Sequence, residues 1–128
     1  GFKELPLHTA LNFENDGSLS EPDQVLLFPD TFCPSAEMIT ICHGDAMIPR
    51  LMPGDWMFLA RAQVDSLVFG QVYIVIAGPI RLCRIVRKGE TTASVRLVSL
   101  KPEKYDELII LRTDIDEVFR LCGTFRHG

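Results

Sequence analysis

From residue 38 onward, the chain consists of short apolar runs that are separated by Gly and Pro residues. The runs are rich in β-branched residues and bounded by turn-forming residues, which is the pattern of β-strands. No run shows the sustained 3.6-residue periodicity of an amphipathic helix. These features predict about seven strands in an all-β fold with little helix, arranged as a curled multi-strand sheet or β-sandwich. The predicted strands are 38–42, 56–60, 71–77, 80–86, 92–100, 108–111 and 118–125.

The N-terminal region differs from the rest of the chain in texture and in charge. Pro, Asn, Asp, Gly and Ser interrupt every short apolar run between residues 1 and 35, which predicts loops. Residues 1–49 contain eight acidic residues and one basic residue, whereas residues 50–128 contain nine acidic and twelve basic residues. We therefore expect an acidic, loop-rich linker or arm over 1–37 and a β domain over 38–128.

The composition excludes several classes of protein. A length of 128 residues suits one compact domain, and a 47% apolar content is not that of a disordered chain. The apolar runs are far shorter than the roughly 20 residues of a membrane span, so no membrane partner is predicted. The four Cys and three His residues lack metal-ligand spacing, so we predict no metal and no cofactor. Dispersed free thiols are typical of a reducing compartment and favour a cytoplasmic location.

Residues 44–59 carry the most specific pattern, Gly-Asp-Ala-Met-Ile-Pro-Arg-Leu-Met-Pro-Gly-Asp-Trp-Met-Phe-Leu. The segment resembles the G-D-S-M-x-P-x-(L/I)-x-x-G-D signature of the LexA-like family, the self-cleaving repressors and their serine–lysine peptidase relatives. Further blocks at 70–76, 82–85, 96–99 and 121–125 resemble the family in order and spacing. The resemblance therefore implies a LexA-like C-terminal domain. The residues that it assigns to the motif and cleft are Gly44, Asp45, Met47, Pro49, Gly54, Asp55 and Arg84.

In this family, a Lys amine activates a Ser hydroxyl for attack on a peptide bond. A free serine is a weak nucleophile, and a Lys serves as its base only when burial lowers the lysine pKa. The resemblance places the Ser at Ala46 and the Lys at Cys83, so both catalytic positions are substituted. The family's repressors cut themselves at an Ala-Gly or Cys-Gly bond, and residues 1–43 contain neither. We therefore expect a domain without peptidase activity.

The resemblance also implies a biological role, as the C-terminal dimerisation and regulatory domain of a LexA-like or phage-repressor-like transcriptional regulator. DNA binding would belong to a helix-turn-helix domain upstream of Gly1, and two copies would form a homodimer. In the family, the segment ahead of the motif can fold across the cleft. The residues expected at the dimer contact are Val118, Arg120, Cys122, Thr124 and Phe125.

Two alternatives stay open. In the first, the chain is an active self-cleaving peptidase whose nucleophile has been replaced by Ala46. In the second, the vacated cleft binds a small ligand or peptide between Ala46, Met47 and Cys83. Cys83 itself is a weak candidate nucleophile. A reactive thiol needs a base or a positive environment, and Arg84 follows on the opposite face of the predicted strand.

Overall fold

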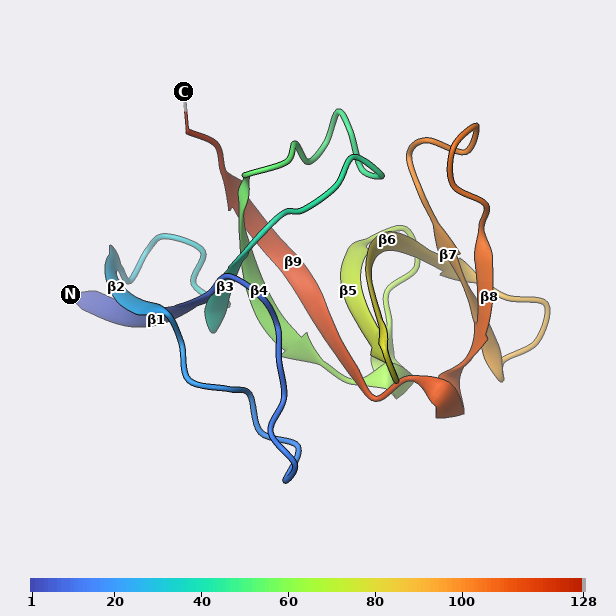
Figure 1. Ribbon diagram of the computed structural model, residues 1–128, viewed down its shortest axis with the longest axis horizontal. Helices are drawn as coiled ribbons and strands as arrows, with labels where there is room; N and C mark the ends of the chain where they lie inside the picture. Colours follow the sequence, from blue (N-terminus) through green and yellow to red (C-terminus); the bar gives the residue numbers. More distant parts are fainter. Residues whose placement is uncertain (128) are drawn as a thin grey trace.

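The computed structural model describes residues 1–127, which consist mainly of strands, turns and loops (Figure 1). Within these residues, nine strands form a single mixed sheet, and two short 3₁₀ turns are the only helical elements. The predicted all-β fold is therefore confirmed. The elements are β1 Phe2–His8, β2 Gln24–Pro29, β3 Met38–Ile41, β4 Trp56–Ala62, η1 Val64–Ser66, β5 Val72–Ala77, β6 Ile80–Lys88, β7 Ser94–Val98, β8 Leu108–Leu111, η2 Arg112–Asp114 and β9 Glu117–Phe125.

The strands lie in the order β2-β1-β3-β4-β9-β5-β6-β7-β8 across the sheet. β1 and β3 run parallel, and the other neighbouring pairs are antiparallel. In Figure 1, β1 and β2 lie at one end of the molecule, and β5 to β8 curl round at the other. β9 crosses between the two parts, because it pairs with β4 on one side and with β5 on the other.

The N-terminal region contains two strands that the sequence analysis did not predict. The prediction of loops over residues 1–35 is wrong for Phe2–His8 and Gln24–Pro29, which pair with each other as β1 and β2. β1 also pairs with β3, so this region extends the sheet of the expected β domain. Leu5 and Leu7 are buried while the residue between them is not, which is the two-residue period of a strand.

Pro6 concealed this strand, because a proline inside a short apolar run argues against a sheet position. The hydrogen bond from Asp30 N to Gly1 O shows that the odd-numbered residues of β1 bond to β2. The backbone nitrogen of Pro6 therefore points away from β2. Pairing of β1 with β3 begins only at Leu7, so the missing N–H of Pro6 removes no bond from the sheet.

Three clusters of buried side chains form the core. One, around Val86, fills the curl of β5 to β8. A second, around Phe58, lies between β1, β3 and β4 and the loop that follows β2. The third, around Leu51, packs the segment between β3 and β4 against β4, β5 and β9. The candidate site adjoins this third cluster, because Cys42 and Met47 belong to both.

Candidate functional site

The motif segment is a folded loop between β3 and β4, closed at its base by backbone hydrogen bonds. Cys42 N donates to Asp55 O at 2.8 Å, and Gly54 N donates to Cys42 O at 2.9 Å. Gly44 and Gly54 have φ values of +85° and +92°, a region in which other residues are strained by their Cβ. The turns at the two ends of the loop therefore account for both glycines of the motif.

Met47 and Pro49 lie in the middle of the same loop. Met47 is buried in the core, and its carbonyl accepts a hydrogen bond from Leu51 N at 2.9 Å, which closes a tight turn. Pro49 follows a cis peptide bond and lines a surface hollow together with Arg126. Met47 thus fixes the loop to the core through its side chain.

Asp55 connects the motif loop to the end of the chain. Its carboxylate is 2% exposed and accepts hydrogen bonds from Arg126 Nε and Nη2, each at 2.9 Å. It also accepts a hydrogen bond from Met52 N at 2.8 Å. The Arg126 contact holds the pKa of Asp55 below its ordinary value. The role of Asp55 is therefore to lock the turn before β4 onto the residue that follows β9.

Asp45 connects the motif loop to the segment between β7 and β8. It accepts hydrogen bonds from Lys104 Nζ at 2.6 Å and from Tyr105 Oη at 2.5 Å. The carbonyl of the next residue, Ala46, accepts from Ser99 Oγ at 2.6 Å and from Leu100 N at 2.9 Å. The position of Ala46 is therefore set from both sides by a segment distant in the sequence.

We expect the Asp45 contacts to make stability depend on pH in the acid range. Hydrogen bonding to Lys104 and Tyr105 lowers the pKa of Asp45 from 3.8 to about 2. A carboxylate with a lowered pKa stabilises the fold at pH values above the unfolded pKa, and this contribution disappears as pH falls through the folded value. Melting temperatures of the wild type and Asp45→Asn should therefore differ at neutral pH and converge between about pH 4 and pH 2. A constant difference over that range would contradict the assignment.

Ala46 and Cys83 line the same cavity, which has a volume of about 180 Å³. The loop at residues 42–47 forms one wall, and β6 forms another through residues 81–84. Burial raises the pKa of the Cys83 thiol to about 12, so the thiol is protonated at neutral pH. The cavity therefore brings together the two positions that the sequence analysis singled out, one with a methyl group and the other with an unionised thiol.

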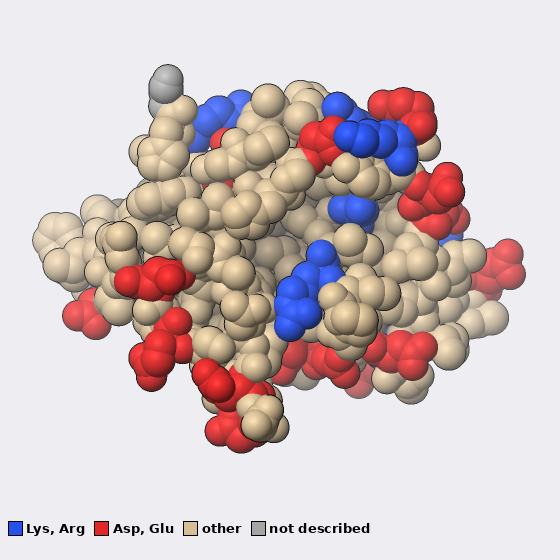
Figure 2. Space-filling model, in the orientation of Figure 1, with Lys and Arg blue, Asp and Glu red and all other residues tan. Residues whose placement is uncertain are grey.

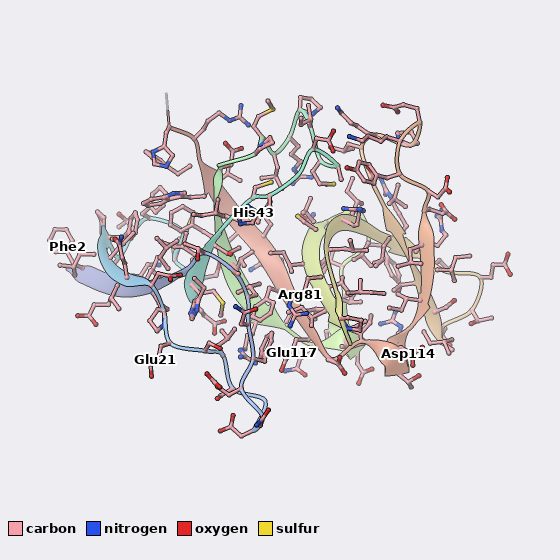
Figure 3. The ribbon with its side chains drawn as sticks, viewed as in Figure 1. Phe2, Glu21, His43, Arg81, Asp114 and Glu117 are labelled. Carbon is pink, nitrogen blue, oxygen red and sulfur yellow. The ribbon has the colours of Figure 1, made fainter. Side chains whose placement is uncertain are left out.

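Part of the segment between β1 and β2 lies beside this cavity. Arg81 Nε donates to Leu11 O at 2.8 Å, and His43 Nε2 lies 3.1 Å from Thr9 O. Leu11 is buried in the same cluster as Met47, and residues 9–11 line a second hollow of about 180 Å³ together with residues 81–83 of β6. Figure 3 shows His43 and Arg81 beside this segment, in front of β9 and β5. Residues 9–11, called the cover segment below, therefore pack beside the cleft at the end that contains Cys83.

No protein-family model matches the chain, and no curated protein matches it either. The LexA-like assignment is thus a proposal. It rests on the motif residues and on the positions of Ala46 and Cys83 on one cavity.

Arg84 contacts two residues that line the cleft, Cys83 and Tyr105. Its guanidinium lies 5.2 Å from the centre of the Tyr105 ring, and Nη1 donates to Cys83 O at 2.8 Å. Tyr105 in turn bonds to Asp45, so Arg84 and Asp45 hold the same aromatic ring from two sides. β6 and the motif loop are joined through this ring.

The residues expected at a dimer contact differ in their exposure. Val118 is fully buried in the core of its own chain, so its side chain has no free surface to offer a second copy in this structure. Arg120 and Cys122 are half-buried, while Thr124 and Phe125 are exposed. β4 pairs with β9 over residues 118–125, whereas β5 pairs with it only over residues 117–120. A dimer contact on β9 stays a prediction, and its exposed candidates are Thr124 and Phe125.

Among residues 1–127, no group of three or more His, Cys, Asp or Glu side chains is placed to hold a metal ion. In the same residues, no helix is both long and apolar enough to cross a membrane. The four cysteines are free thiols, and Cys42 and Cys83 lie together at the cleft.

Several residues that shape the site were not singled out as site residues from the sequence. These residues are Arg81, Tyr105 and Arg126, and none of them belongs to the motif. The sequence offers one clue for Arg81. It lies two positions before Cys83, so the two side chains share a face of the strand.

Charged side chains are unevenly distributed over the surface. Figure 2 shows basic side chains near the centre and top of this face, and acidic side chains along its lower left. The segment between β1 and β2 contributes four acidic residues, Glu14, Asp16, Glu21 and Asp23.

Proposed function

We propose that this chain is a LexA-like domain that has lost peptidase activity and serves as the regulatory and dimerisation domain of a transcriptional regulator. The observation that carries the proposal is the cavity shared by Ala46 and Cys83. Residues 9–11 line an adjoining hollow that also reaches Cys83. The resemblance assigns the catalytic Ser and Lys to those two positions. DNA binding would belong to a separate helix-turn-helix domain, and the location would be cytoplasmic.

The chemistry of the cleft supports the loss of activity. Acyl transfer through a Ser needs a hydroxyl and a base within hydrogen-bond reach of each other. Ala46 has no such oxygen, and Cys83 has no amine. The thiol of Cys83 is held protonated by burial, with a pKa of about 12, so it is a poor substitute nucleophile at neutral pH. A cleft without a nucleophile or a base can still bind a chain segment.

A second function, binding of a peptide in the cleft, is favoured by the way in which residues 9–11 are held. Two backbone carbonyls of this segment, at Thr9 and Leu11, face the side chains of His43 and Arg81. Contacts to backbone oxygen do not depend on the side chains of the bound segment. An external extended peptide is therefore a possible occupant whenever the cover segment is displaced.

The test of the proposal is self-cleavage in alkaline buffer, where a Lys base would be deprotonated. We expect the chain to stay intact by mass spectrometry, because no group in the cleft can activate a nucleophile. The matched variant carries Ala46→Ser together with Cys83→Lys, which restores both groups of the dyad. Fragments from this variant alone, cut near residues 9–11, would support the assigned geometry.

Two fragments from the unchanged chain, with masses that add up to the whole plus one water, would contradict the proposal. Cleavage at a rate independent of protein concentration would identify the reaction as intramolecular. A Cys83→Ser variant then tells whether the thiol was the nucleophile.

A further inference from the structure

β8 is an end strand of the sheet, and its outer edge pairs with no strand of residues 1–127. Ile109 is 61% exposed and Leu111 is 50% exposed, whereas Leu108 and Ile110 pack against the core. The strand contains neither a charged residue nor a proline, the features that commonly keep a sheet edge from pairing. The opposite end strand, β2, does contain a proline, Pro29.

The direction of the backbone groups in β8 follows from one hydrogen bond. Arg112 N donates to Ala93 O at 2.9 Å, which continues the register that pairs Leu111 with Ser94. In an antiparallel pair, residues that bond to the neighbour alternate with residues whose N–H and C=O point the other way. Ile110 therefore bonds to β7, and Ile109 and Leu111 direct their backbone groups to the open edge.

We propose that β8 pairs antiparallel with β8 of a second copy of this chain, about a two-fold axis at Ile110. In this register, Ile109 lies opposite Leu111 of the second copy, and Leu111 lies opposite its Ile109. These are the residues whose backbone groups face outward, so each pair exchanges its N–H and C=O bonds. The backbone pattern of β8 is thus complementary to itself.

The side chains agree with the same register. A two-fold axis perpendicular to the sheet keeps equivalent side chains on the same face. The exposed Ile109 and Leu111 of both copies then form one apolar stripe of cross-strand pairs, which stabilises paired strands. One register therefore satisfies the backbone and also covers the exposed apolar side chains.

The space beside the edge is not filled by the chain itself. A hollow of about 360 Å³ lies between β8 and the turn from β5 to β6, and Ile80 and Ile109 are among the residues that line it. Ile80 is 37% exposed, so the hollow has an apolar wall on each side. Apolar side chains of a second copy that enter the hollow would remove this apolar surface from water, which is favourable in free energy.

This inference rests on one part of the proposed function, dimerisation, and names the strand that forms the contact. It assigns the contact to β8, whereas the sequence analysis expected it on β9. The absence of peptidase activity is independent of either contact.

The test is sedimentation over a concentration series, with two β8 variants and one control. Ile109→Lys places a charge in the apolar stripe. Leu111→Pro removes an N–H that faces the open edge and leaves the bonds to β7 in place. We expect the unchanged chain to form a reversible dimer and both variants to dimerise at least about tenfold more weakly. The control Phe125→Lys, at the exposed end of β9, should dimerise like the unchanged chain.

Each other outcome counts against the inference in a distinct way. A chain that stays monomeric at every concentration overturns both this contact and the dimerisation part of the proposed function. A dimer weakened by Phe125→Lys and not by Ile109→Lys overturns the β8 contact alone. Circular dichroism identifies a variant that fails to fold, and if Leu111→Pro is such a variant, Ile109→Lys decides the result. The self-cleavage experiment tests the rest of the proposed function separately.

Discussion

Replacing Phe58 by Ala is expected to lower the free energy of unfolding by about 3–5 kcal/mol. Phe58 is fully buried, and its ring meets Phe28 edge-on at 5.3 Å and Phe32 at 5.0 Å between ring centres. Truncation removes the buried ring and leaves a cavity that a sheet on one side and a loop on the other cannot close. The melting temperature of a chain of this length should fall by about 10–20 °C.

The same substitution tests whether the first 37 residues belong to the folded core. Phe28 and Phe32 come from β2 and the loop that follows it, so both would lose their contact with the Phe58 ring of β4. Limited proteolysis should therefore cut the N-terminal region of Phe58→Ala faster than that of the unchanged chain. The control is Phe2→Ala, at a ring that is 71% exposed, for which we expect little change. Similar melting temperatures for Phe58→Ala and the control would contradict this packing.

Replacing Leu11 by Asp is expected to uncover Cys83. Leu11 is 6% exposed among apolar side chains, and an unpaired carboxylate is too costly to bury there, so the cover segment should leave the cleft. Exposure to water returns the pKa of the Cys83 thiol from about 12 toward its ordinary value of 9.0. After allowance for the lower intrinsic reactivity of a less basic thiolate, alkylation of Cys83 should accelerate about 30-fold.

The measurement is the rate at which iodoacetamide modifies each cysteine at neutral pH, followed by peptide mass spectrometry. Cys33 and Cys122 lie away from the cleft and serve as internal references. Leu27→Asp, at a side chain 69% exposed on β2, is the matched control and should leave the Cys83 rate unchanged. Equal Cys83 rates in Leu11→Asp and the unchanged chain would show that the segment does not protect the cleft.

The strands from residue 38 onward were predictable because each is a short β-branched run that ends at a turn residue. β1 and β2 were not, since Pro6 and the acidic residues around them resemble loop composition. Whether a proline is tolerated depends on the direction of its nitrogen in the sheet, which the sequence does not reveal. The order of the strands was also beyond prediction, because the placement of β9 between β4 and β5 depends on long-range packing.

The candidate site was predictable at the positions defined by the motif and not at those defined by tertiary contact. The motif placed Ala46 and Cys83 far apart in sequence, and both line one cavity in the structure. Tyr105 and Arg126 hold Asp45 and Asp55 through contacts that span 60 and 71 residues. The neighbouring sequence does not distinguish an aromatic or basic residue that makes such a contact from one that faces solvent.

The central position of β9 has a consequence for synthesis of the protein. The strands before residue 63 form one block of the sheet, and those between 72 and 111 form another, and β9 supplies the strand pairing between them. As the chain leaves the ribosome, the strands of each block can pair before residues 117–125 emerge, but the pairing that joins the two blocks must wait for these residues. Ribosomal stalling or premature termination shortly before residue 117 would therefore release two half-sheets with open edges, which are prone to aggregate.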